Sequence, residues 1–157
     1  MTNEQLKEAE EFFDKLLSQL ETSSTELKEP YVVPKLDADV IKHALTHTIG
    51  MNTRVLESLP EGSAKNRTET FKRGLESLLK KADSDQTLTI DNMFEAYCLC
   101  WALDENIEFI QYGLDKHSEG MTDEHRRFTD SILSVYQRNL DALTKLTDIV
   151  LEPPIKK

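Results

Sequence analysis

Two histidines are the residues whose type and spacing most directly suggest chemistry. His43 and His47 lie four positions apart in a segment with helical periodicity, and this spacing allows two imidazoles to bind one metal ion. However, they project from the side of that helix opposite its apolar residues, such as Ile41 and Leu45, where no third ligand is evident. The chain also lacks the Glu-x-x-His motifs of carboxylate-bridged two-metal bundles. We therefore expect solvent-exposed histidines and no metal or cofactor.

A group of carboxylates forms a second candidate centre, because such a group can do acid-base chemistry or bind a hard cation. If the next helix returns antiparallel, Arg138 lies near Asp104, and Arg126 or Arg127 lies near Asp115. Exposed ion pairs of this kind contribute at most about 1 kcal/mol each, so they explain why the charges are tolerated. We interpret this face as a binding surface rather than a catalytic one. Its carboxylates are Asp104, Glu105, Glu108 and Asp115.

Other catalytic signatures are missing from the sequence. It contains no glycine-rich phosphate loop, no nucleophile elbow and no Cys-His pair at a useful spacing. Asn139 interrupts an apolar stripe, where it could contact a ligand or fix the register of helix packing, and the second role is the commoner one. Cys98 and Cys100 point about 200° apart on a helix, so they cannot bond to each other and are expected to be reduced core residues.

The charge balance excludes several classes of partner. Nineteen basic and 29 acidic side chains give a net charge of -10. Nucleic acids and anionic membranes both require a basic face, so neither is an expected partner. The longest apolar run, 96–103, is far shorter than a bilayer span, and the first residues lack a secretory signal. We therefore expect a single cytoplasmic domain, 1–157, with its own core.

The element that must position any site is a central helix predicted for residues 89–118. Its first half is apolar nearly all round, which predicts that other helices surround it, whereas its second half is amphipathic. Thr89 is expected to cap this helix and Gly120 to end it. Apolar residues at spacings of four, three and four form its packing edge: Ala96, Cys100, Leu103 and Ile107.

Four further helices complete an all-α antiparallel bundle. Thr2 and Gln5 form a capping box at the start of the first, Asp37 is expected to cap the second, and Pro153 and Pro154 to end the last. Gly50 inside the second helix could kink it. The predicted helices are 3–21, 37–59, 64–82, 89–118 and 122–151, and the last two form a long hairpin.

One connection in this bundle is long. Residues 22–35 lack periodicity, and two prolines hold Tyr31, Val32 and Val33 extended between them. We interpret the segment as a linker that joins the first helix to a four-helix core, with these three side chains on the bundle surface. No strand is predicted.

The sequence is best interpreted as a non-catalytic acidic helical bundle that acts through protein-protein interaction, as an adaptor, regulator or inhibitor. The apolar stripe of the first helix must pack on its own bundle, another copy or another protein, since an isolated amphipathic helix is marginal in water. One alternative is a metal- or small-molecule-binding bundle, which could be enzymatic, using His43 and His47 or the carboxylates around Glu108. Another is a homo-oligomeric structural protein that exchanges its first helix. The predicted partner-binding residues are Phe12, Phe13, Leu16, Leu17, Leu20, Asp104, Glu108 and Asp115.

Overall fold

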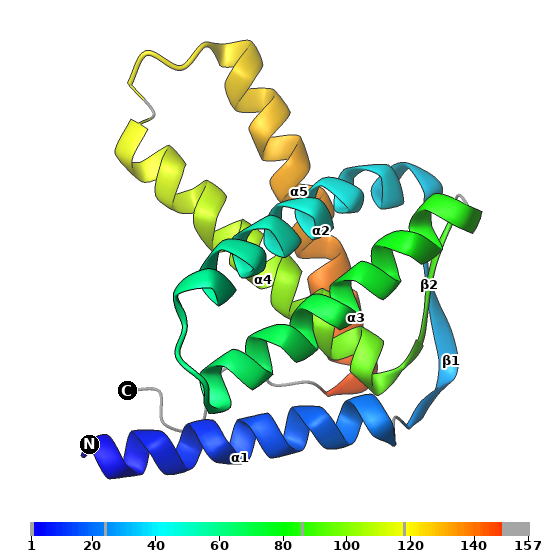
Figure 1. Cartoon of the computed structure of the whole chain (residues 1–157). Coiled ribbons are helices and arrows are strands. Elements are labelled where there is room, and N and C mark those ends of the chain that lie inside the picture. The colour runs from blue at the N-terminus through cyan, green and yellow to red at the C-terminus, as the bar shows by residue number, and fades with distance from the viewer. Residues whose placement is uncertain (1, 24, 86, 118, 149–157) are drawn as a thin grey trace.

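In the part of the chain that the structure describes, five helices form the body of the protein, which confirms the all-α bundle predicted from the sequence (Figure 1). The computed structural model describes residues 2–23, 25–85, 87–117 and 119–148. Within them, no helix is both long and apolar enough to cross a lipid bilayer. The helices are α1 (Asn3–Thr22), α2 (Lys35–Ser58), α3 (Ser63–Asp85), α4 (Met93–His117) and α5 (Asp123–Thr147).

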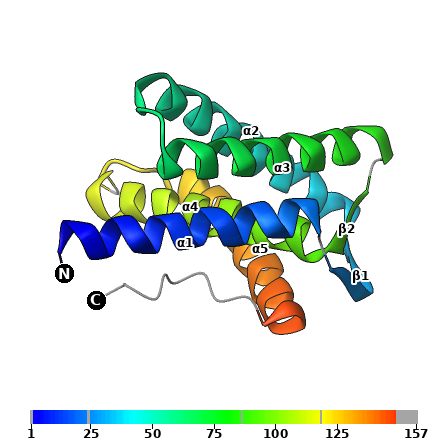
Figure 2. The same ribbon diagram turned by 60° about the horizontal axis from the view of Figure 1, so that its bottom comes forward.

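Helix α1 packs along α3 and α4 of its own chain (Figure 2). The predicted capping box is present, because Thr2 Oγ1 accepts a hydrogen bond from the Gln5 amide at 3.1 Å and Gln5 Oε1 accepts one from the Thr2 amide at 2.9 Å. Near its other end, Arg73 of α3 donates two hydrogen bonds of 2.9 Å to the carboxylate of Glu21. Leu17 is the buried residue of α1. The helix is therefore attached to the bundle along a narrow edge.

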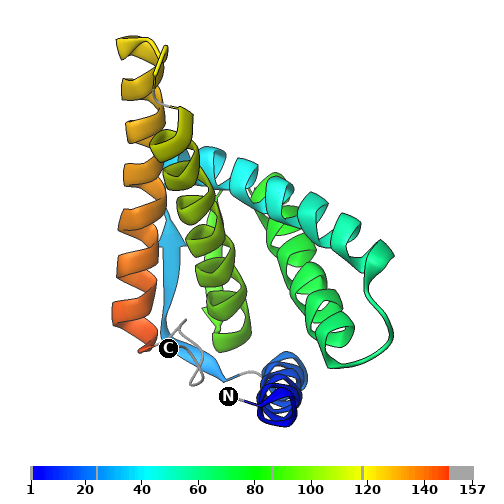
Figure 3. The same cartoon turned by 90° about the vertical axis from the view of Figure 1, so that its left-hand side faces the viewer.

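Helix α4 is the central element, as predicted, and contacts every other helix. Its first half is enclosed, whereas only Asn106 and Ile107 are buried in the part that follows Leu103. Beyond that point α4 and α5 continue as an antiparallel hairpin whose connected ends extend past the other helices (Figure 3). Gly120 lies at this turn with φ of 83°, a left-handed conformation that glycine adopts without strain. The predicted long hairpin is thus confirmed.

A small antiparallel sheet corrects the expectation that the chain has no strand. Strand β1 (Glu26–Val33) pairs with β2 (Leu88–Asn92), and Val33 lies opposite Leu88. Val33 is fully buried, so the prediction that residues 31–33 lie on the surface is wrong there, although Val32 is exposed. Eight of the 14 residues of the predicted linker therefore form a strand. Local periodicity missed it because its partner is distant in the sequence.

Several helix ends differ from the predicted ones. Because β2 occupies residues 88–92, α4 begins at Met93 and Thr89 is not its cap. Helix α2 begins behind Pro34, two residues before the predicted cap Asp37, and it runs through Gly50 without a break. Helix α3 continues to Asp85 rather than ending at 82. Thr122 caps α5 as expected, but the helix ends at Thr147, with Asp148 in a left-handed conformation, rather than at 151. The prolines predicted to end it lie outside the described residues.

A buried polar cluster joins β1, α2 and α5. The Asn139 amide donates to Asp37 Oδ2 at 3.0 Å and to the Val135 carbonyl at 2.8 Å, and its oxygen accepts from the Tyr31 hydroxyl at 2.6 Å. Arg138 also donates to Asp37, so its guanidinium has a partner on α2 that the sequence did not predict. The side-chain amide of Asn139 therefore hydrogen-bonds to residues of the same chain. This favours a role in fixing the register of helix packing over contact with a ligand.

Candidate functional site

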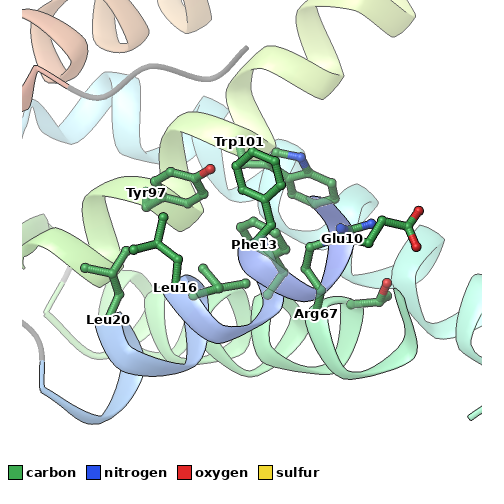
Figure 4. Close-up of a pocket in the computed structure, with 10 residues that line it drawn as sticks. Glu10, Phe13, Leu16, Leu20, Arg67, Tyr97 and Trp101 are labelled. Atoms are coloured by element: carbon green, nitrogen blue, oxygen red, sulfur yellow. The ribbon is translucent and has the colours of Figure 1, made fainter. Parts of the chain in front are cut away.

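Two cavities lie on either side of Trp101, and we name them by the helix that covers each. The α1 cavity, of about 330 Å³, lies between α1, α3 and α4 (Figure 4). Its walls are mainly apolar and aromatic, with Arg67 and Glu10 among them. Trp101 is half-buried and stacks on Phe71, with ring centroids 4.4 Å apart and planes 15° apart. The aromatic wall is continued by Tyr97, whose ring lies 5.9 Å from that of Phe71.

The α2 cavity, of about 280 Å³, lies between α2, α3 and α4. Thr68 and Trp101 line both cavities, so the two adjoin. We call the pair the Trp101 cleft. Polar residues that take part in the wall of the α2 cavity are His47, Thr48, Asn52, Glu105 and Asn106, although most of the surface that it presents is apolar.

A hydrogen-bond network fixes one side of the α2 cavity. The Asn106 amide nitrogen donates to Thr48 Oγ1 at 2.8 Å and to the Ala102 carbonyl at 2.7 Å, so its oxygen must face His47 Nδ1 at 3.0 Å. Because that oxygen only accepts, Nδ1 carries the hydrogen, and Nε2 of the neutral ring carries the lone pair. The His47 ring also lies 5.0 Å from the Phe109 ring. His47 is therefore a partly buried, oriented side chain.

This placement corrects part of the prediction for the histidine pair. His43 is exposed as expected, but His47 is not, because α4 supplies Asn106 to the face of α2 that the apolar stripe had suggested was free. Within the described residues, no group of three or more His, Cys, Asp or Glu side chains is arranged to hold a metal ion. The alternative metal site at His43 and His47 therefore has no third His, Cys, Asp or Glu ligand among these residues.

Asn52 is the exceptional polar residue of the α2 cavity. Its exposed fraction is only 5%, and no described residue accepts a hydrogen bond from its amide nitrogen. A buried polar group without a partner costs about 1–3 kcal/mol. The sequence held a signal for this residue, since Ile41, Leu45, Thr48 and Asn52 follow the spacing of a buried helix face.

The predicted acidic face lies along the outer half of α4. Glu108 and Asp115 are exposed, and Asp104 is partly buried. Partial burial, together with the charges of Glu108 and Asp104, raises the pKa of Glu105, which lines the α2 cavity. The carboxylates therefore form a negative rim beside the cleft.

Exposed aromatic residues on the hairpin were not anticipated from the sequence. The exposed fractions of Phe109, Tyr112 and Phe128 are 60%, 62% and 65%. Phe109 and Tyr112 lie on α4 among the acidic residues, and Phe128 lies on α5. Lys116 Nζ lies 5.9 Å from the centre of the Tyr112 ring, a cation-π distance. We call these three aromatic residues the hairpin surface. The sequence feature that could have predicted this surface is the presence of large aromatic residues on an otherwise polar face of the helix.

The predicted residues of the first helix divide between the cavity and the solvent. Phe13, Leu16, Leu17 and Leu20 line the α1 cavity, whereas Phe12 is 59% exposed. The structure therefore brings four of the five to one place but separates them from Asp104, Glu108 and Asp115, which line neither cavity.

Comparison with known proteins provides no further guide. No family model matches the chain, and neither do any curated proteins or solved structures. The function is therefore inferred from the site itself, since fold alone does not determine it.

Proposed function

We propose that this protein is a non-catalytic binding protein that acts by contacting another protein through the hairpin surface. The observation that carries the proposal is the exposure of about 60% at Phe109, Tyr112 and Phe128. Aromatic residues are enriched in protein interfaces and often supply most of the binding energy. The hairpin that bears them extends past the other helices, so a partner has open access to it (Figure 3).

The charges around the hairpin surface indicate the kind of partner. Glu108 and Asp115 are exposed on the same helix as Phe109 and Tyr112, and the whole chain has a net charge of -10. A second copy would bring like charges together, which costs free energy. We therefore expect a different protein whose apolar contact residues are flanked by lysine or arginine.

A non-catalytic, cytoplasmic protein agrees with the state of its cysteines. Cys98 and Cys100 are free and buried. Burial raises the pKa of both thiols, that of Cys100 to about 12, so neither forms the thiolate needed for nucleophilic attack. Free core thiols are typical of reducing compartments.

Site-specific photo-crosslinking tests this proposal. The full-length protein would be expressed in its native host with a benzophenone amino acid at Tyr112 or, as a control, at the exposed Glu76 of α3. We expect a discrete adduct from position 112 only, joined to a partner segment that contains apolar and basic residues. Identical adducts from both positions, or none from position 112, would contradict the proposal. An adduct with a second copy of the chain would contradict the charge argument.

A further inference from the structure

The α2 cavity is continuous with the hairpin surface, because Phe109 belongs to both. Two further large apolar residues that line this cavity, Met51 and Val55, are also exposed. Exposed apolar residues that gather around a cavity are typical of a contact surface, since burying them on binding is favourable. The cavity is therefore an opening in the surface that contacts a partner in the proposed function.

His47 presents a hydrogen-bond acceptor at this cavity. Its Nδ1 donates to the oxygen of the buried Asn106 at 3.0 Å, and Nε2, on the other side of the imidazole ring, carries the lone pair. Nε2 has no hydrogen-bond partner among the described residues and, unlike the Asn52 nitrogen, it is accessible to solvent. Because Asn106 fixes both the tautomer and the ring, Nε2 is an oriented acceptor that a bound group can reach.

The wall of the α2 cavity favours an aromatic ring. The cavity has a volume of about 280 Å³, and both Trp101 and Phe109 line it. Aromatic rings attract one another in stacked or edge-on arrangements. Among the side chains, tryptophan combines a large ring with an N–H that only donates. It therefore suits both the aromatic wall and the lone pair of His47 Nε2.

Carboxylates beside the cavity favour basic neighbours for that ring. Glu105 lines the cavity, and Glu108 follows it by one turn on α4. Both are exposed, and no ion pair among the described residues includes either of them. A lysine or arginine beside the inserted ring would pair with these carboxylates, whereas an acidic residue there would be repelled.

We propose that the protein partner inserts a tryptophan side chain into the α2 cavity and carries lysine or arginine next to that tryptophan. The indole N–H donates to His47 Nε2, and the ring packs against the aromatic wall. The neighbouring basic side chain pairs with Glu105 or Glu108.

This inference rests on the proposed function, since Phe109 contacts the same partner in both. The converse does not hold, because Tyr112 and Phe128 do not line the cavity. A partner could therefore bind the hairpin surface without filling the α2 cavity, and the two proposals need separate measurements.

The capped tripeptide acetyl-Lys-Trp-Lys-amide is the probe, and NMR of the full-length protein at pH 8 follows its binding. We expect saturable shifts of the Met51 and Phe109 amides, which line the cavity, and of His47 Nε2. The amide of Leu143, a buried residue of α5, should not shift comparably.

Two related peptides test what selects the side chain. In the first, β-(3-benzothienyl)alanine replaces tryptophan, which keeps the shape of the ring but removes its N–H. It should bind about fivefold more weakly, the value of one hydrogen bond. The second, acetyl-Glu-Trp-Glu-amide, should bind at least about tenfold more weakly, because the carboxylates beside the cavity repel it.

A substitution at His47 separates the hydrogen bond from the shape of the cavity. His47→Asn keeps a side-chain N–H that can donate to Asn106 but removes the acceptor at Nε2. It should therefore bind the tryptophan and benzothienyl peptides equally well. His43→Asn, at the exposed histidine one turn earlier on α2, is the matched control and should keep the fivefold preference.

A second variant tests the charges and serves if His47→Asn does not fold. Replacing both Glu105 and Glu108 with Gln, at exposed positions, should reduce the preference for the lysine peptide over the glutamate peptide by at least about threefold. Replacing Glu4 and Glu8 with Gln, at exposed positions of α1, is the matched control and should leave that preference unchanged.

Three results would overturn the inference: no saturable response to the lysine peptide, equal binding of the tryptophan and benzothienyl peptides by the wild type, or an undiminished preference in folded His47→Asn. If one of these occurs while an adduct still forms at position 112, the partner binds the hairpin surface and leaves the cavity empty. Peptide binding as expected without an adduct at position 112 would contradict only the contact through Tyr112 and Phe128.

Discussion

Arg138 on α5 binds Asp37 on α2 from the solvent side, with Nη2 at 2.8 Å from Oδ1 and 2.7 Å from Oδ2. From the inner side, Asn139 donates to the same carboxylate at 3.0 Å. Asp37 has an exposed fraction of 7%, whereas the Arg138 side chain is 60% exposed. Asp37 is therefore the buried member of this ion pair and Arg138 the solvated one.

Removing the two members should have unequal effects. Asp37→Ala leaves one N–H of the buried Asn139 amide without its acceptor, and we expect a loss of about 2–3 kcal/mol in the free energy of unfolding. Arg138→Ala removes two hydrogen bonds to the same carboxylate, but water can replace this 60% exposed side chain, so the cost should be smaller, about 1 kcal/mol. Urea unfolding of both variants measures this difference. Equal losses would show that the exposed guanidinium contributes as much as the buried amide.

The same carboxylate predicts a dependence of stability on pH. Burial by itself raises the pKa of Asp37, but the hydrogen bonds from Arg138 and Asn139 outweigh it, and the net shift is downward. A carboxyl group with a lowered pKa in the folded state stabilises the fold above its unfolded pKa of about 3.9. This contribution is lost as the pH falls through the folded pKa. We expect a smaller loss of unfolding free energy below about pH 4 in Asp37→Asn than in the wild type.

Two helical glycines should respond oppositely to alanine. A Cβ at Gly74 of α3 would lie 2.5 Å from Cys98 Sγ and 3.0 Å from the Phe94 ring. Gly74→Ala must therefore displace these packed side chains of α4 and should destabilise the protein by about 1–3 kcal/mol. A Cβ at Gly50 of α2 would meet nothing within 4 Å. Gly50→Ala should stabilise by up to about 1 kcal/mol. Thermal unfolding of both variants checks the contrast, which a loose α3-α4 contact would abolish.

The attachment of α1 can be tested with a matched pair on one helix. Leu17→Ala empties a buried site and should cost about 2–3 kcal/mol, whereas Phe12→Ala, at a mostly exposed position, should change stability by less than about 0.5 kcal/mol. Denaturant unfolding measures both, and sedimentation velocity reports the oligomeric state. A cost at Leu17 that depends on protein concentration would support exchange of α1 between copies.

The helices could be predicted because their signals are local. The stripe through Ala96, Cys100, Leu103 and Ile107 is buried as the spacing implied. The strands could not, because Tyr31 and Ile90 reveal their pairing only when brought together in the fold. Each segment alone was compatible with a linker or a helix start.

The candidate site was less accessible to sequence reasoning than the fold. The helical periodicity of α2 predicted that His47 is exposed to solvent. Periodicity within one helix carries no information about Asn106, which contacts His47 from α4. Asn52 was visible as a polar residue on a buried face, but the sequence could not show that its amide nitrogen has no acceptor among the described residues. Phe109 and Tyr112 were not recognised in the sequence because acidic residues surround them there.

The β1-β2 pairing also constrains the order of folding. Val33 and Leu88 meet only after the intervening chain has turned back on itself, and that chain is mostly the antiparallel pair α2 and α3. Closing so large a loop before those helices associate carries an entropy cost that their packing offsets. The sheet is therefore a late contact. In pulse-labelled hydrogen exchange, the β1 and β2 amides should gain protection after those of α2 and α3.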